Sequence, residues 1–159
     1  GRVGMTLNTM KKIAFCCIAA IGLLFSFESQ AKPKVFLYGG MMMYTRGVEA
    51  VARDLRKSCG AEVKINPSSD QVRRAARSGG PIIVGGHSMG ASKAERAAES
   101  AAPSRIKLFV AFDPMPPVSK PDNVAALKIY RPSNYPGSWH VSIASDKRVI
   151  ADVRKRVCG

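Results

Sequence analysis

The sequence has 159 residues, 46% of them apolar, which favours one compact domain and excludes an intrinsically disordered chain. Gly and Pro occur 14 and 10 times without a repeat, which excludes a collagen-like protein. The formal net charge is +14, and such a charge attracts anionic lipid, envelope polymers or nucleic acid. Because the basic residues are scattered, we expect the charge to serve solubility, with an anionic envelope surface as the alternative partner and no specific nucleic-acid binding.

The start of the chain, residues 1–31, has the pattern of an export signal. Lys11 and Lys12 precede an apolar run over residues 13–27, and a small-x-small cleavage pattern ends at Ala31. The run is shorter than the roughly 20 apolar residues of a transmembrane helix, so an uncleaved anchor is the less favoured alternative. We therefore expect cleavage after Ala31 and export to the periplasm or the exterior, with one domain over residues 32–159.

Strands and helices are predicted to alternate along this domain. Short apolar runs that end in turn residues predict strands, and apolar residues at helical spacing predict helices. Thr45 and Ser145 are the expected caps of the first and last helices. The strands are expected at 35–38, 62–65, 82–85, 106–112 and 124–130, and the helices at 46–58, 70–78, 89–102 and 145–157. The alternation predicts an α/β fold with a parallel sheet of five, possibly six, strands covered by helices on both faces.

A possible nucleophile stands between the third strand and the helix that follows it. The segment Gly86-His87-Ser88-Met89-Gly90 matches the pattern G-x-S-x-G, which in a strand–turn–helix context places a serine hydroxyl above a sheet. The two glycines would remove side chains that collide with neighbouring elements. The backbone N–H of Met89 would point at an oxyanion. The alternative is a glycine-rich turn capped by Ser88.

A serine nucleophile needs a base, and the chain has two histidines. His87 lies next to Ser88 in the turn, where its side chain is expected to point elsewhere. His140 follows the last predicted strand, where the chain order Ser, acid, His expects the base. We therefore predict His140 as the base; the alternative is a surface or core histidine.

The acid that orients the imidazole is predicted to be Asp113. It ends the strand after the Ser88 helix, so it should share a sheet edge with Ser88. Asp122 precedes the next strand and should lie at the opposite edge. Asp146 begins the last helix, where the helix dipole explains a carboxylate without catalysis. The alternative for Asp113 is a turn residue before Pro114.

The loop after the first strand is predicted to supply the second oxyanion donor. The backbone N–H of Gly40 or Met41 is the candidate, and the sequence does not choose between them. Adjacent methionines suggest a pliable apolar wall for an acyl group, although they could also fill the core. The predicted pocket residues are Met42, Met43, Tyr44 and Trp139.

These residues make the chain resemble the α/β-hydrolase superfamily. The resemblance covers residues 35–157 and rests on GGHSMG after a strand, the YGG loop and the late His140. The runs VAFDP, PDNV and HVSI resemble, more narrowly, short bacterial lipase- or thioesterase-like hydrolases. The resemblance implies a minimal three-layer α/β/α domain with strand order 2-1-3-4-5. Two features depart from the superfamily: the first antiparallel strands and a cap domain are missing, and the acid comes one strand early.

The implied fold also pairs the cysteines. The first and last helices of such a sheet cover the same face, and Cys59 and Cys158 end them, so a disulfide is expected; two free thiols are the alternative. Cys16 and Cys17 would leave with the signal peptide.

The predicted activity is hydrolysis of a small-molecule or lipid ester or thioester, by a monomer that needs no metal or organic cofactor. The alternatives are an acyltransferase and a catalytically silent, basic envelope-binding protein.

Overall fold

The computed structural model describes residues 30–159. The predicted signal peptide, with Cys16 and Cys17, lies outside the described residues, apart from its last two positions. Among the residues described, no helix is long and apolar enough to cross a membrane.

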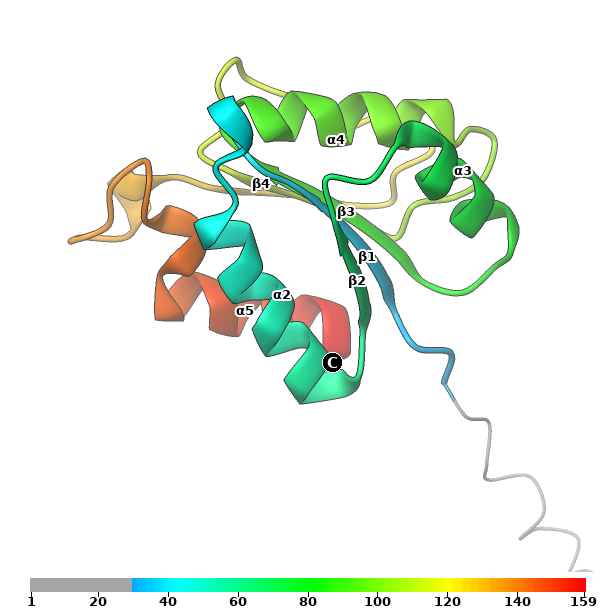
Figure 1. The fold of residues 1–159 in the computed structure, drawn as a ribbon, viewed down its shortest axis with the longest axis horizontal. Helices are drawn as coiled ribbons and strands as arrows, with labels where there is room; N and C mark the ends of the chain where they lie inside the picture. Colours follow the sequence, from blue (N-terminus) through cyan, green and yellow to red (C-terminus); the bar gives the residue numbers. More distant parts are fainter. Residues whose placement is uncertain (1–29) are drawn as a thin grey trace, which may run out of the picture. The chain divides into compact units, whose positions relative to one another are not determined.

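The domain is built on one sheet of five parallel strands in the order β2-β1-β3-β4-β5 (Figure 1). The strands are β1 (Lys34–Tyr38), β2 (Glu62–Ile65), β3 (Ile82–His87), β4 (Leu108–Phe112) and β5 (Leu127–Tyr130). Both the α/β class and the strand order confirm the prediction. Since all strands run the same way, their carboxyl ends meet at one edge of the sheet, and the segments that follow them meet there too.

Two helices cover each face of the sheet (Figure 1). One face carries α2 (Arg46–Cys59) and α5 (Lys147–Cys158), and the other carries α3 (Ser69–Arg77) and α4 (Met89–Ser100). The side chains of each strand alternate between these layers, so Val35 and Leu37 pack with α2 and α5 whereas Phe36 and Tyr38 pack with α3 and α4. The three-layer arrangement predicted from the sequence is therefore confirmed.

The inner strands β3 and β4 are buried at every position, as expected of a sheet covered on both faces. A stripe of small side chains, Ala91, Ala94, Ala98 and Ala101, is also buried and lets α4 lie close to the sheet. This close packing fixes where α4 begins, and therefore where Ser88 stands.

Several details differ from the expectation. The fourth strand starts at Leu108 rather than at residue 106, because Ile106 forms only an isolated bridge. The last strand starts at Leu127 rather than at residue 124, because the Val124 N–H donates to the Pro121 carbonyl in a turn and Val124 meets Ile106 only in an isolated bridge. The last helix is capped by Asp146 instead of Ser145.

The Asp146 carboxylate accepts the Arg148 N–H at 2.8 Å. Hydrogen bonds from the Arg148 guanidinium, and next from the Ser138 hydroxyl, hold the pKa of Asp146 well below its usual range. Thr45 does occupy the cap position of α2, but its hydroxyl donates to the Glu49 carboxylate (2.8 Å) rather than accepting a backbone N–H.

Helices α2 and α5 are joined at their carboxyl-terminal ends by a disulfide between Cys59 and Cys158, which confirms the predicted pair. One further contact links the helices: the Arg154 guanidinium donates to both oxygens of Asp54, at 2.8 and 2.6 Å. The disulfide closes a segment with a sequence separation of 99 residues, so it constrains most of the described chain.

Candidate active site

Ser88 occupies a sharp turn between β3 and α4. Its backbone has φ 56° and ψ −123°, a combination that favours glycine over residues with side chains. The flanking glycines allow this turn. A Cβ on Gly86 would lie 2.2 Å from the Gly90 carbonyl oxygen, and a Cβ on Gly90 would lie 2.4 Å from the carbonyl oxygens of Tyr38 and Gly39. The G-x-S-x-G spacing is therefore a packing requirement of this turn.

The structure brings Ser88, His140 and Asp113 together at the carboxyl edge of the sheet. The Ser88 Oγ lies 3.0 Å from His140 Nε2, and His140 Nδ1 lies 2.7 Å from Asp113 Oδ2. In the tautomer that this pattern requires, Nδ1–H donates to the carboxylate and Nε2 accepts the serine proton. The three residues come from separate loops, after β3, β5 and β4. The arrangement is a continuous hydrogen-bonded relay of a hydroxyl, an imidazole and a carboxylate.

Residues at the end of β5 contact both the backbone and the side chain of Asp113. Asp113 has a positive φ of 42°, and its N–H donates to the Tyr130 carbonyl at 2.7 Å. The Arg131 guanidinium lies 3.9 Å from Asp113 Oδ1, the oxygen that His140 leaves free. Asp146 instead caps α5, so among the three carboxylates considered from the sequence the structure places Asp113 against the imidazole.

Two backbone N–H groups, one directly after Ser88 and one in the loop after β1, are without a hydrogen-bond partner among the described residues. Within the part of the chain that the structure describes, the N–H groups of Met41 and Met89 make no hydrogen bond, whereas the Gly40 N–H donates to the Tyr44 carbonyl at 3.0 Å. The loop after β1 does reach the serine, because a Cβ on Gly40 would lie 3.5 Å from the Ser88 Cβ. Of the two N–H groups considered from the sequence, Gly40 and Met41, only that of Met41 is therefore without a partner in the described part of the chain.

Asn66, directly after β2, holds this loop from the other side. Its side-chain oxygen accepts the Gly39 N–H at 2.9 Å, and its own backbone has a positive φ of 50°. Sequence reasoning did not single out Asn66; its place before Pro67, at the end of a strand next to β1, was the available signal.

The side chain of His87 makes a contact that sequence reasoning did not predict. Its side chain is only 4% exposed, and its Nε2 lies 2.6 Å from the His140 carbonyl oxygen, to which it donates in the corresponding tautomer. The two imidazole rings are 4.9 Å apart. Burial, the largest influence, lowers the pKa of His87. The prediction that this side chain points away from the site thus missed its contact with the backbone of His140.

Large apolar side chains surround the site and remain exposed. We call this set the apolar rim: Met41, Met42, Tyr44, Met89, Met115, Trp139 and Val141. Each belongs to a segment that follows a strand at the carboxyl edge. Four of the predicted pocket or oxyanion-loop residues, Met41, Met42, Tyr44 and Trp139, are therefore exposed in the segments after β1 and β5, and Met41 and Met42 do not fill the core. The position of the Met43 side chain is not described.

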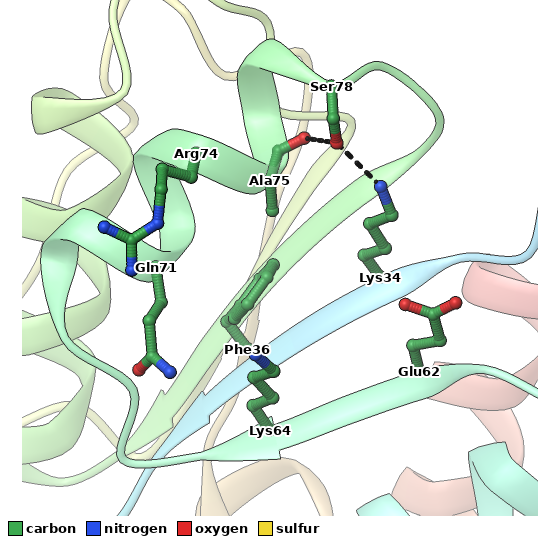
Figure 2. Close-up of a pocket in the computed structure, with 8 residues that line it drawn as sticks. All are labelled: Lys34, Phe36, Glu62, Lys64, Gln71, Arg74, Ala75 and Ser78. Atoms are coloured by element: carbon green, nitrogen blue, oxygen red, sulfur yellow. Dashed lines mark hydrogen bonds between the residues drawn. The ribbon is translucent and has the colours of Figure 1, made fainter.

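A separate hollow of about 330 Å³ lies beside the edge strand β2, below α3 (Figure 2). Its lining is mostly polar, and Lys34 donates to the Ser78 hydroxyl, which donates in turn to the Ala75 carbonyl. The hollow holds no imidazole or thiol beside its hydroxyl. The hydroxyl that contacts an imidazole is instead that of Ser88.

No protein-family model matches this sequence, and a search of curated proteins found no significant match. Over residues 30–159, no three His, Cys, Asp or Glu side chains lie close enough together to hold a metal ion.

Proposed function

We propose that this chain is a serine hydrolase of the α/β-hydrolase type, which cleaves an ester or thioester through Ser88, His140 and Asp113. The observation that carries the proposal is the continuous hydrogen-bonded relay from Ser88 Oγ through both nitrogens of His140 to Asp113. A solvent-exposed serine on an ordinary turn would need neither the strained backbone nor the two partners.

In the proposed reaction, Ser88 Oγ attacks the acyl carbon while its proton moves to His140 Nε2. The carbonyl oxygen becomes negative, and the N–H groups of Met41 and Met89 stabilise it; one such donor contributes about 10²- to 10³-fold to kcat. The bond to the leaving group then breaks, and His140 returns the proton to the alkoxide or thiolate. An acyl group remains on Ser88.

Water completes the cycle. His140 takes a proton from the water as its oxygen attacks the acyl-serine, and then returns that proton to Ser88 Oγ as the carboxylic acid leaves. Asp113 keeps the imidazole in the required tautomer and stabilises its charged form. The His140 side chain is 38% exposed, so water reaches it readily.

A fluorophosphonate probe, which reacts with activated serines, tests the proposal. We expect labelling of the wild type, loss of labelling in Ser88→Ala, and full labelling in the matched control Ser133→Ala, which changes an exposed serine of the loop after β5. A folded wild-type protein that does not react would refute the hydrolase proposal and favour a silent binding protein. A series of acyl esters and thioesters of graded chain length then identifies the substrate, with Ser88→Ala as the blank.

We also propose that the protein acts outside the cytoplasm. The export signal predicted over residues 1–31 supports this location. The Cys59–Cys158 disulfide supports it as well, because such bonds persist in oxidising compartments.

A further inference from the structure

The large apolar side chains that are exposed, among those the structure describes, lie in the segments that follow β1, β3, β4 and β5 at the carboxyl edge of the sheet. All seven large apolar side chains that remain exposed among the described residues belong to the apolar rim, with Met42 94% and Trp139 74% exposed. Single exposed apolar residues are ordinary on a protein surface, but a cluster around a site marks an interaction surface or a ligand-binding mouth. A surface of this kind suits contact with an apolar partner beside Ser88.

The charges beside the rim favour an anionic partner. Arg46 follows the loop that bears Met41 and Met42, and Arg131 begins the loop that bears Trp139. Both are exposed, and Arg131 also lies 3.9 Å from the Asp113 carboxylate. The carboxylates of these loops are engaged: Asp113 pairs with His140, and Asp146 pairs with Arg148 and the hydroxyl of Ser138, the residue before Trp139. The whole chain, including residues 1–31, carries a formal net charge of +14, which attracts anionic surfaces.

We propose that the apolar rim docks on the surface of an anionic phospholipid bilayer, and that the acyl ester attacked by Ser88 is drawn from that surface. Methionine and tryptophan side chains enter the boundary between headgroups and acyl chains, while nearby arginines meet anionic headgroups. The docking half stands on the rim and its charges alone. The substrate half rests on the proposed hydrolase function.

Expected magnitudes follow from burial and charge. Moving one methionine side chain from water into an apolar phase corresponds to roughly a tenfold change in affinity. One arginine near an anionic surface adds about fivefold, an effect that salt screens. Several rim side chains acting together are therefore sufficient for stable but reversible docking.

The experiment uses the full chain bearing Ser88→Ala, so that binding is measured without turnover. Unilamellar vesicles of phosphatidylcholine, with or without phosphatidylglycerol, are titrated into the protein. Trp139 is the only tryptophan of the chain, so its fluorescence reports on the rim directly. We expect a blue shift of its emission and co-sedimentation with the phosphatidylglycerol vesicles, both stronger than with phosphatidylcholine alone.

Variants of the rim locate the contact. Added to Ser88→Ala, Met42→Ser and Met115→Ser should each weaken vesicle binding about tenfold. The matched control Lys155→Ser, which shortens an exposed side chain on α5, should change it by no more than about fivefold. All variants share the same N-terminus, so differences among them report on the rim. Circular dichroism verifies that each variant is folded.

Three results would overturn the docking inference. The first is no binding to either vesicle, and the second is binding that Met42→Ser and Met115→Ser leave unchanged. The third is a Trp139 emission already blue-shifted without lipid together with a dimer in sedimentation, since the rim would then cover a second copy of the chain. The two proposals fail separately: fluorophosphonate labelling without vesicle binding overturns this inference alone, whereas vesicle binding without labelling overturns only the hydrolase proposal and the substrate half.

Discussion

At the amino edge of the sheet, the turns before β2 and β3 use glycine wherever φ is positive, at Gly60, Gly79 and Gly80. At the carboxyl edge, residues with side chains adopt positive φ directly after four successive strands or in the loop that follows. These residues are Met42, Asn66, Ser88 and Asp113, with Gly137 as the glycine on this side. A side chain at positive φ costs roughly 1–2 kcal/mol, a cost that glycine avoids.

The difference between the two edges shows that, at the carboxyl edge, particular side chains are retained although a positive φ strains their backbone. Ser88 and Asp113 belong to the relay, Asn66 holds the loop after β1, and Met42 is the most exposed member of the rim. Strained backbone gathers at functional sites when the surrounding structure enforces it. Here the buried strands β3 and β4 and helix α4 hold the backbone of Ser88 and Asp113 at positive φ. The disulfide joins α2 to α5 at the opposite edge.

The largest expected effect removes the charge of Asp113 and leaves its backbone unchanged. Asparagine tolerates positive φ, so Asp113→Asn should fold normally yet lower kcat about 10⁴-fold, because the imidazole loses the partner that fixes its tautomer. Steady-state kinetics on the best ester measures this. Asp122→Asn, at the amino edge, is the matched control and should keep full activity. Equal activity of all three proteins would leave Asp113 as a turn residue before Pro114.

The second test acts on the amino edge. Replacing both Cys59 and Cys158 by serine should lower the free energy of unfolding by about 4 kcal/mol, from the loop-closure entropy of the unfolded chain. Urea unfolding measures the loss. The relay lies at the other edge, so kcat of the folded variant should remain close to that of the wild type. A large fall in kcat without a loss of stability would show that the two edges are coupled.

Two glycine substitutions compare the edges directly. Gly90→Ala should cost about 3 kcal/mol or more, because its Cβ would meet two backbone oxygens that cannot move aside. Gly79→Ala, at the amino edge, meets no atom within 4 Å and should cost only the strain of positive φ, about 1 kcal/mol. Chemical denaturation gives both values. A mild effect at Gly90 would mean that α4 can shift away from β1.

The smallest expected effect is a pH dependence of stability from His87. Burial lowers its pKa below the ordinary 6.5, so as the pH falls below 6.5 the unfolded chain binds a proton that the folded chain does not. Stability should therefore decline in acid over this window, whereas above it the contribution is constant. In His87→Gln, whose amide can still donate to the His140 carbonyl, the decline should be shallower. Identical pH profiles from urea unfolding would contradict this role.

Much of the fold followed from local patterns. Apolar runs separated by amphipathic helices predicted the α/β class and the parallel sheet. The strand order and the pairing of Cys59 with Cys158 came from the resemblance to the α/β-hydrolase superfamily. The start of β5 was not predictable from local patterns, because the Val124 N–H donates to the Pro121 carbonyl in a turn instead of bonding to the neighbouring strand β4. The cap at Asp146 was missed because Ser145, also a good capping residue, stands next to it.

At the candidate site, residue types and chain order were sufficient to nominate Ser88, His140 and Asp113. Choosing Met41 over Gly40 required the hydrogen bond from Gly40 to Tyr44, which depends on the path of the backbone. The contact of His87 with His140 joins positions 53 residues apart and has no local pattern. Met115 and Val141 could not be assigned to the rim for a similar reason, since exposure depends on what packs nearby.

The backbone conformation of Ser88 sets thermal stability against the proposed activity at a single position. Its φ of 56° and ψ of −123° suit glycine better than serine. We expect Ser88→Gly to unfold at a higher temperature than the wild type, while Ser88→Ala, which keeps the Cβ, gains nothing of this kind. Selection for thermal stability alone would then replace Ser88 with glycine, so a serine at this position would be retained only for the advantage that its hydroxyl provides.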